Sequence, residues 1–247
     1  MNRPTIRDIY AICEATWPPA TSRAEGPWTI REGQGGGKRV SAATLAGEFD
    51  AATIARAERA MADIGQPSLF MIRDGEDALD AALAGRGYDI VDPVVAYLAP
   101  VGGLAGQEVP PMTTFPIWQP LAVMKEVWAG GGIGPERLAV MDRVAGPKTA
   151  IMGRRNDRVS GCAFVAIHEK TAMLHALEVV PEQRRQKSAV YMLRSAARWA
   201  QDQGADWMSL VVTEANGPAR ALYASLGMTI VGHYHYRLKA RKRGQSS

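Results

Sequence analysis

A basic joint between two apolar segments is the first feature of the sequence that could do chemistry. In "VVPEQRRQKSAVYML", Val179 to Leu193, a strand-like run ends at Pro181 and helical spacing begins after Lys187. The first amides of a helix lack intrahelical partners and lie at the positive end of the helix dipole, so they attract anions. The joint therefore predicts a site for a polyanionic ligand, and a surface turn rich in arginine is the alternative interpretation.

A second stretch, "TEANGPARALYASLGM", runs from Thr213 to Met228. Asn216 stands at the start of its predicted helix and Gly227 lies just past the end. The asparagine is expected to cap the helix, to contact a ligand at the helix start, or to do both. The predicted helix contains two titratable side chains, those of Arg220 and Tyr223.

Together the two stretches resemble the motifs of the GNAT superfamily of acyl-CoA-dependent N-acyltransferases. The coenzyme loop of that family has the form R/Q-x-x-G-x-G/A after a strand ending in Val-x-Pro, which Val179, Pro181, Arg184 and Ala189 match. The later motif, N-x-x-A-x-x-L-Y-x-x-x-G-F, is met by Asn216, Ala219, Leu222, Tyr223, Gly227 and, conservatively, Met228. The resemblance covers roughly residues 115–238.

The sequence departs from the family pattern at Lys187, where the family has a glycine. Glycine lets the backbone approach a pyrophosphate closely. A lysine still offers its amide, and its ammonium can pair with a phosphate oxygen. The competing expectation is that Lys187 crowds the loop and weakens coenzyme binding.

The resemblance implies acetyl-CoA as cofactor and a primary amine of a small-molecule or amino-acid-like acceptor. It implies that the pantetheine arm pairs with the backbone of Val179 and Val180, with a nearby backbone amide polarising the thioester carbonyl. The implied cofactor-binding residues are Val179, Val180, Arg184, Arg185, Gln186, Lys187, Ser188, Ala189, Asn216 and Tyr223.

Acyl transfer to an amine needs a neutral amine, donors for the oxyanion and a proton for the departing thiolate. Tyr223 is the predicted general acid, because a phenol with a pKa near 10 can protonate a thiolate whose thiol has a pKa of about 8.5. Glu178 is the predicted general base, acting through water. The alternatives are a core tyrosine bonded to backbone and a surface carboxylate.

Two histidines of the last strand could in principle bind a metal ion. His233 and His235 share one face of it, but the sequence suggests no third ligand, so we expect a half-exposed strand surface and no metal. His175 has no obvious partner in the sequence, and we expect it to be structural.

The elements that must position these residues follow from hydrophobic periodicity. The C-terminal half predicts strands at 148–154 and 159–167 joined by "RNDR", a strand at 171–180, and a helix at 188–203. A buried strand "WMSLVV", a helix at 216–226 and a strand at 228–238 follow, and helices are predicted at 117–128 and from Pro135. The resemblance implies an α/β (α+β) GNAT fold with a mixed, mostly antiparallel central sheet flanked by helices.

A similar run of elements occurs in both halves. "SLFMIRDGEDALDAALAGRGYDIV" and "MSLVVTEANGPARALYASLGMTIV" superpose at a shift of 140 residues, which places Gly227 on Gly87 and Tyr223 on Leu83. We therefore expect two tandem GNAT-like domains: a degenerate one at 1–100 without the tyrosine, a linker at 101–115, and a catalytic one at 116–247.

The glycine run "GQGGGK" in the first half is not expected to bind phosphate. A P-loop needs G-x-x-x-x-G-K-[ST] between a buried strand and a helix, whereas Arg39 follows Lys38 here. We expect a hairpin around the glycines, then a helix in "DAATIARAERAMADIG" and a strand in "SLFMI".

Composition bounds the class of protein. Of 247 residues, 47% are hydrophobic and 22% charged, as in ordinary globular proteins, and we expect neither a membrane span nor a signal peptide. Cys13 and Cys162 make no disulfide framework, so the cytoplasm is the expected compartment. The net charge of +4 gathers partly in the tail "RLKARKRGQSS", which we expect to be solvated rather than bound to nucleic acid.

The sequence leaves three functions open: a catalytic acetyltransferase, a non-catalytic CoA-binding or interaction protein with a decayed site, and a nucleic-acid binder using the tail. It also leaves a homodimer open and does not encode the identity of the acceptor.

Overall fold

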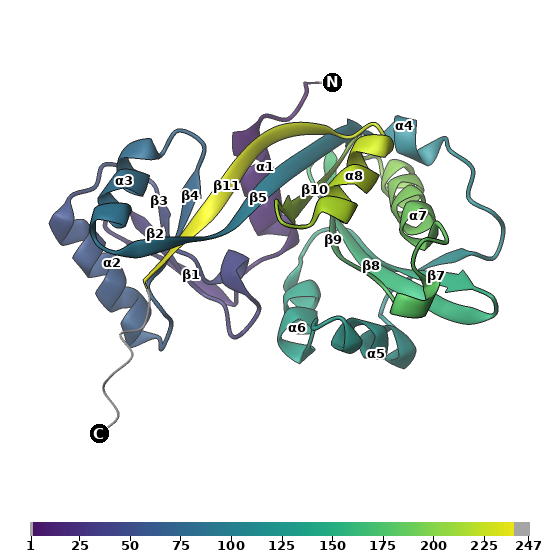
Figure 1. Ribbon diagram of the computed structural model, residues 1–247, viewed down its shortest axis with the longest axis horizontal. Coiled ribbons are helices and arrows are strands. Elements are labelled where there is room, and N and C mark those ends of the chain that lie inside the picture. Colours follow the sequence, from purple (N-terminus) through teal and green to yellow (C-terminus); the bar gives the residue numbers. More distant parts are fainter. Residues whose placement is uncertain (1, 240–247) are drawn as a thin grey trace. The chain divides into compact units, whose positions relative to one another are not determined.

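The computed structural model of the chain describes residues 2–239 (Figure 1). These residues form two compact units, which are described separately here. Within the described residues, unit 1 comprises residues 2–18, 95–212 and 216–231, and unit 2 comprises residues 19–94, 213–215 and 232–239. Two long strands, β5 (Tyr88–Pro100) and β11 (Thr229–Lys239), contribute residues to both units.

Unit 1 contains most of the regular structure. Its elements, besides the parts of β5 and β11, are α1 (Ile6–Thr16), α4 (Val101–Ala105), β6 (Thr114–Ile117), α5 (Ala122–Gly130), α6 (Pro135–Arg143), β7 (Lys148–Arg155), β8 (Arg158–His168), β9 (Thr171–Val179), η2 (Pro181–Gln183), α7 (Ser188–Asp202), β10 (Trp207–Thr213) and α8 (Gly217–Ser225).

The main sheet has the strand order β4-β11-β5-β10-β9-β8-β7-β6. The pairs β6–β7, β7–β8, β8–β9 and β4–β11 are antiparallel, and β9–β10 is parallel. Helices α1, α5 and α7 contact β8 and β9. The expectation of a mixed, mostly antiparallel sheet flanked by helices is confirmed.

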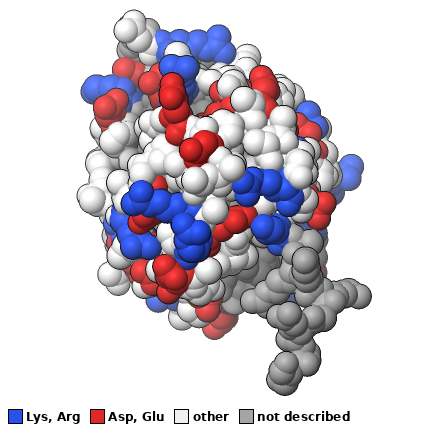
Figure 2. Space-filling view, turned by 90° about the vertical axis from the view of Figure 1, so that its left-hand side faces the viewer, with Lys and Arg blue, Asp and Glu red and all other residues white. Residues whose placement is uncertain are grey.

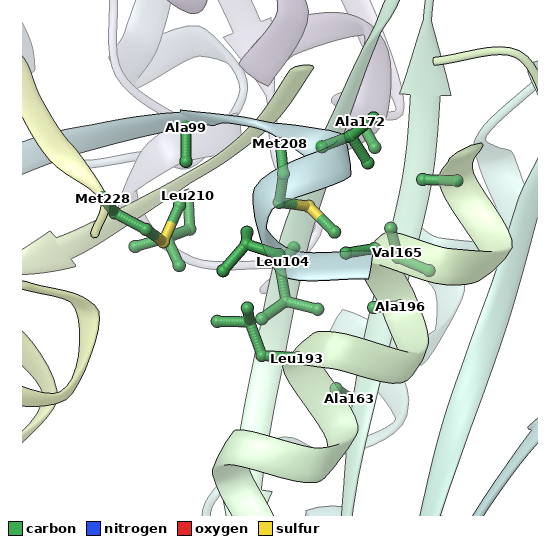
Figure 3. Packing of buried hydrophobic residues seen from close by; sticks show 14 of the residues in the cluster. Ala99, Leu104, Ala163, Val165, Ala172, Leu193, Ala196, Met208, Leu210 and Met228 are labelled. Carbon is green, nitrogen blue, oxygen red and sulfur yellow. The ribbon is translucent and has the colours of Figure 1, made fainter. Parts of the chain in front are cut away.

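The main core of unit 1 lies between the sheet and helices α4 and α7. Figure 3 shows Leu104 of α4 lying between Met208 of β10 and Leu193 of α7. Ala196 faces the same core, and such small side chains let α7 approach the sheet closely. Burying a Leu or Met side chain of this kind contributes about 1.5–3 kcal/mol.

The opposite face of the unit 1 sheet packs against α1. Because side chains alternate along a strand, Met173 joins Ile9 and Ile12 while its neighbours Ala172 and Leu174 join the α7 core. The helix begins with a capping box in which Thr5 and Asp8 satisfy each other's backbone amides.

Unit 2 is built around a small antiparallel sheet of order β1-β2-β3. Its elements, besides the parts of β5 and β11, are β1 (Thr21–Glu25), β2 (Trp28–Glu32), η1 (Lys38–Val40), β3 (Thr44–Leu45), α2 (Ala51–Asp63), β4 (Leu69–Arg73) and α3 (Asp77–Gly85). Trp28, Phe70 and Tyr88 pack edge to face in its core. Strands β2 and β3 pair across the glycine run, so the predicted hairpin is confirmed.

The two halves of the chain repeat the same elements at the predicted offset. Helices α3 and α8 coincide at both ends after a shift of 140 residues, and β4 and β5 fall on β10 and β11. Gly87 and Gly227 both have left-handed backbones, with φ of 79° and 77°. A residue other than glycine would be strained in that conformation.

The predicted linker at 101–115 is wrong. Residues 101–105 form α4, whose Val101 and Leu104 are buried in the unit 1 core, and β6 begins at Thr114. Glycines and prolines suggested a loop, but the apolar residues between them reach the α7 core. The helix predicted from Ile117 begins at Ala122 instead, because Ile117 pairs with Ala150 in the sheet.

The predicted boundaries 1–100 and 116–247 do not match the compact units. Residues 1–18 and 95–105 belong to unit 1, because Ile9 and Ile12 pack on Ala96 and Leu98 and because Val95 and Tyr97 enter the α7 core. Within residues 2–239 no helix combines the length and apolar character that crossing a bilayer requires.

Candidate active site

Strand β9 carries a bulge in its C-terminal half, where it pairs with β8. The β8–β9 register passes from Phe164 opposite His175 to Cys162 opposite Glu178, so one residue of β8 faces both Ala176 and Leu177. Ala176 has a left-handed backbone with φ of 50°. The extra residue shifts side-chain alternation by one position, a known effect of bulges next to active sites.

The parallel ladder between β9 and β10 is short. It pairs Thr171–Leu174 with Trp207–Leu210, while β9 continues to Val179 and β10 to Thr213. The two strands therefore stop pairing just before the bulge. The edge of residues 175–179 that faces β10 lies outside this ladder, and an extended amide-bearing ligand could pair with it.

The chain between β9 and α7 forms a tight loop of left-handed residues. After η2, Arg185 and Lys187 have φ of 63° and 66°. Lys187 is the N-cap of α7 and makes no side-chain cap, whereas Thr5, Asp50 and Asn216 cap α1, α2 and α8. The first amides of α7 are thus not covered by a capping side chain.

The backbone of Lys187 shows how a lysine can occupy the position where the family has a glycine. Its backbone keeps the left-handed conformation that glycine adopts most readily, and its side chain is exposed. The crowding considered for this position is therefore not seen in the backbone path. Ser188 is buried, and its hydroxyl donates to the carbonyl of Gln183, which ties the start of α7 to η2.

Arg184 lies back over the end of β9. Its Nε donates to the carbonyl of Val179 at 3.1 Å, and its Nη2 donates to Glu178 Oε1 at 3.3 Å. The Arg184 side chain is 57% exposed and that of Glu178 only 22%. The arginine is therefore the partner that can move into solvent.

Glu178 is held against the loop between α5 and α6. A Cβ placed on Gly131 would lie 2.6 Å from the Glu178 carboxyl carbon, so this position tolerates no side chain without moving the glutamate. Gly131 was not among the site residues predicted from the sequence. The glycine run at residues 130–132 was visible in the sequence, but its contact with β9 was not.

Two further glycines let α7 approach the sheet. Gly153 of β7 and Gly161 of β8 are register partners, and a Cβ on either would lie within 3.0 Å of Met192 in α7. A Cβ on Gly161 would also lie 2.3 Å from the backbone oxygen of Glu178. These glycines, also missed from the sequence, bring the start of α7 close to the end of β9.

Tyr223 belongs to the main core of unit 1. It is 7% exposed, and its ring centroid lies 5.7 Å from that of Tyr97. Burial, together with the nearby Tyr97 phenol, raises the pKa of Tyr223 to about 12. Among residues 2–239 its hydroxyl has no hydrogen-bond partner, so a core tyrosine bonded to backbone does not describe it.

Asn216 is exposed and caps α8. Its Oδ1 accepts from the amide of Ala219 at 3.2 Å. The capping role is confirmed, and this helix start, like that of α7, lies in unit 1.

The histidines have partners that the sequence did not suggest. His175 is buried, and its Nε2 lies 2.9 Å from the hydroxyl of Thr16 in α1. Because that hydroxyl donates to the carbonyl of Ile12, it accepts from His175, which places the imidazole proton on Nε2.

His233 and His235 lie in unit 2 and contact different carboxylates, Glu214 and Asp80. Over the described range of the chain, His, Cys, Asp and Glu side chains form no group of three that could hold a metal ion.

A small cavity of about 80 Å³ lies elsewhere in unit 1. It is lined by Trp118, Gln119, Pro120, Lys125, Leu138, Met141 and Asp142. Trp118 also packs against Phe164 of β8 and beneath the ammonium of Lys148. The cavity is smaller than the pockets that usually hold small-molecule ligands, so no ligand is assigned to it.

Comparisons with known proteins agree with this geometry. The sequence pattern of the acetyltransferase (GNAT) family matches residues 122–228. The chain is 25% identical over 243 residues to YobR of Bacillus subtilis, described as an uncharacterized N-acetyltransferase, covering 95% of this chain and 98% of that protein.

Solved structures show the same fold. A GCN5-related N-acetyltransferase from Kribbella flavida has a TM-score of 0.72 at 17% identity, covering 96% of each chain. A tandem GNAT protein from the clavulanic acid biosynthesis pathway has a TM-score of 0.61 at 12% identity, covering 97% of this chain and 89% of that one. The second likeness agrees with the predicted duplication. Residues 122–228, in which β9 and β10 stop pairing and which hold the α7 loop and Tyr223, thus match the acetyltransferase (GNAT) family, and this match supports an acyltransferase that uses acetyl-CoA.

Proposed function

We propose that the chain transfers an acetyl group directly from acetyl-CoA to a primary amine of a small-molecule or amino-acid-like acceptor. The observation that carries this proposal is the arrangement of two features in unit 1. Strands β9 and β10 stop pairing after Leu174, and the loop after β9 leads to a helix start without a side-chain cap. An extended amide arm ending in a diphosphate needs these two features side by side along the chain.

The residues of the loop are assigned to the coenzyme. The amides that begin α7 at Ser188 and Ala189 would bind the diphosphate, with cationic and amide side chains of Arg185, Gln186 and Lys187 around it. Val179 and Val180 are assigned to the pantetheine arm. The Val180 N–H donates to the carbonyl of Ser160 and the Val180 carbonyl accepts from the amide of Gln183, so Val180 would pair with the arm only after one of these bonds opens. Because Arg184 donates to the Val179 carbonyl, we expect it to move aside when the arm binds.

Asn216 and Tyr223 complete the proposed coenzyme site from α8. Asn216 keeps its helix cap through Oδ1, which leaves its amide nitrogen for the coenzyme. Tyr223 would lie beside the thioester sulfur.

The chain's own residues would carry the proton transfers. Acetyl-CoA supplies the thioester, whose carbonyl carbon forms a C–N bond to the amine as its C–S bond breaks. Tyr223 would give its phenolic proton to the departing thiolate, and its raised pKa keeps it protonated at neutral pH. The nitrogen of the new amide would lose its extra proton to the Tyr223 phenolate, which restores the acid. Glu178 would accept, through water, the proton that the acceptor ammonium must lose. Its close packing against Gly131 supports a fixed position for that carboxylate.

We propose that the N-terminal repeat is a degenerate GNAT domain without a coenzyme site. Leu83 is buried at the position that matches Tyr223, so the acid is missing. The carboxylate of Asp50 accepts from the amide of Thr53 at the start of α2, where it would repel a diphosphate. Strand β3, which precedes α2, has only two residues and offers little edge to an extended arm.

A non-catalytic CoA-binding protein is the second candidate, and one observation favours it. The Arg184 side chain pairs with Glu178, the proposed base, and an ion-paired carboxylate is less available to bind the water that would carry a proton from the acceptor. The two candidates differ in turnover rather than in coenzyme binding.

The experiment that tests the proposal combines two assays. Calorimetry compares acetyl-CoA with acetyl-pantetheine, which lacks the diphosphate, and thiol release is then measured with a panel of primary amines. We expect tighter binding of acetyl-CoA and amine-dependent thiol release. Equal affinity for both thioesters would contradict the diphosphate site. Tight binding without release on any amine, and no change in Tyr223→Phe, would favour the non-catalytic alternative.

We expect no nucleic-acid partner. On the face shown in Figure 2, Lys and Arg side chains alternate with Asp and Glu side chains, a mixture that attracts a phosphate backbone less than a uniformly basic face does. Most of the basic tail, residues 240–247, lies outside the described residues. Cys13 and Cys162 are buried cysteines that are not disulfide-bonded, which supports the cytoplasm as the compartment.

A further inference from the structure

Trp128 of α5 makes a hydrogen bond to the backbone of β9. This side chain of α5 is fully buried, and its Nε1 donates to the carbonyl oxygen of Ala176 at 2.8 Å. Ala176 is the left-handed residue of the β9 bulge. Helix α5 contacts both β8 and β9, so the indole reaches the bulge from a packed helix rather than from a loop.

The bond fixes the direction of one peptide group. In a trans peptide the C=O and the following N–H point in opposite directions. With the Ala176 carbonyl held by the indole, the N–H of Leu177 must therefore point away from Trp128. The β9–β10 ladder ends at Leu174, and the β8–β9 register pairs His175 and Glu178 but neither residue between them, so Leu177 lies outside both registers.

The residue before Ala176 is also held. His175, immediately before Ala176, donates from Nε2 to the hydroxyl of Thr16 in α1. The bulge thus has an anchor on each of two helices. A peptide group fixed by such contacts can keep its N–H directed at a developing negative charge without reorganising. This is the main requirement for oxyanion stabilisation.

We propose that Trp128 is a positioning residue that orients the Ala176–Leu177 peptide so that the Leu177 N–H donates to the thioester carbonyl oxygen of acetyl-CoA. This inference rests on the proposed function, because it names the residue that sets up the donor of that reaction. Trp128 touches neither substrate. It acts through the peptide that it holds.

The test replaces the indole by side chains that lack the donor. Trp128→Phe keeps a buried aromatic ring, and benzothienylalanine at position 128 keeps the bicyclic shape but carries sulfur in place of N–H. Trp28→Phe is the matched control, since Trp28 is equally buried but its Nε1 has no hydrogen-bond partner among the described residues. It belongs to unit 2, whereas the β9 bulge belongs to unit 1.

Two readouts separate positioning from structural damage. The first is kcat against the Kd for acetyl-CoA, and the second is the isotope-edited infrared stretch of the thioester carbonyl in the bound coenzyme, which a hydrogen bond lowers. We expect both position-128 variants to lose about 10- to 100-fold in kcat, with Kd within about threefold of the wild type, since losing a whole oxyanion donor costs about 100- to 1000-fold. The carbonyl stretch should move toward its value in water-free solvent.

The outcomes are distinct from those that test the function itself. An unchanged carbonyl stretch and unchanged kcat in the benzothienylalanine variant would overturn the role of Trp128 while leaving the acetyltransferase in place. If the wild type bound acetyl-CoA but turned over no amine, the infrared shift would still test the peptide orientation. A similar loss in Trp28→Phe would mean that any indole removal damages the protein, which would also count against the proposal.

Discussion

At the residue scale, Tyr223 combines an apolar environment with the capacity to give up a proton. Burial against the α7 core disfavours the phenolate, so the pKa rises to about 12 and the group stays protonated. A hydroxyl without a protein partner in the described part of the chain keeps its proton for a ligand.

Tyr223→Phe is expected to lower kcat by about 100-fold or more, because the thiolate then leaves without a general acid. The Kd for acetyl-CoA should change little. The measurement is thiol release at saturating amine, with Tyr97→Phe as a control that keeps the ring contact. In the wild type kcat should not fall between pH 8 and about pH 10, since Tyr223 is still protonated there. A descending limb of kcat centred near pH 9 that vanishes in Tyr223→Phe would contradict the raised pKa of Tyr223.

Lys187 shows that backbone conformation, rather than residue type, is what the loop requires. Lys187→Gly removes the cost of a left-handed lysine, about 1 kcal/mol, but adds flexibility to the unfolded chain. We expect the free energy of unfolding to stay within about 1 kcal/mol of the wild type in urea titrations. Acetyl-CoA affinity should fall less than about tenfold if main-chain amides do most of the binding. A larger loss, matched by Lys187→Gln, would assign the binding to the ammonium instead.

At the scale of elements, the end of β9 depends on close packing with β8 and α7. Gly161→Ala would place a methyl group 2.3 Å from the carbonyl oxygen of Glu178, a backbone atom that cannot move without shifting β9. We expect a destabilisation of about 1–3 kcal/mol and weaker acetyl-CoA binding. Gly103→Ala in α4 is the control, since its Cβ would meet nothing within 4 Å. Equal behaviour of the two variants in thermal melts and calorimetry would contradict the close approach.

Strand β11 is held in unit 2 by an ion pair with α3. The Arg237 guanidinium donates through Nε and Nη2 to the two oxygens of Asp80, and His235 contacts the same carboxylate. The hydrogen bonds from Arg237 outweigh burial and lower the pKa of Asp80 from 3.8 to about 2. Because the folded pKa is lowered, the stabilisation is present above about pH 4 and is lost as pH falls through about 2.

Asp80→Asn should therefore destabilise the protein at pH 7 by on the order of 3 kcal/mol, since it leaves Arg237 buried without its counter-ion. Its stability should also change less between pH 4 and pH 2 than that of the wild type. Urea unfolding across this range measures both effects. The double variant Asp80→Asn/Arg237→Met should recover part of the loss, and a full loss in that variant would mean that the charge pair is not the cause.

At the scale of the whole molecule, the residues that match the family, 122–228, form only part of a folding unit that also includes α1 and part of β5. Val95 and Tyr97 of β5 enter the α7 core, and Ile9 and Ile12 of α1 cover the other face of the sheet. A domain lacking these residues would expose both faces.

A fragment of residues 116–247 is accordingly expected to lack a cooperative unfolding transition and to aggregate. Circular dichroism with urea titration measures this, with the full chain as the control. Co-expression with residues 1–115 should restore a folded, acetyl-CoA-binding complex, because those residues supply the missing strand and helix. A cooperative, coenzyme-binding 116–247 fragment would contradict the unit boundaries.

The sequence by itself determined the local features of this protein. Proline and glycine positions and hydrophobic periodicity located β7 to β11, α7 and α8 to within a few residues, because these signals depend on neighbours along the chain. The loop after Pro181 and the cap at Asn216 are local in the same sense.

Only the tertiary structure decided which distant residues complete the site. The left-handed Ala176 and the bond to it from Trp128, 48 residues earlier, depend on how α5 packs against β9. Gly131 and Gly161 matter only because Glu178 lies against them in space. The predicted linker was wrong for the same reason: whether a Gly-rich segment is a loop or part of the core depends on the apolar surface that the rest of the fold offers to Val101 and Leu104.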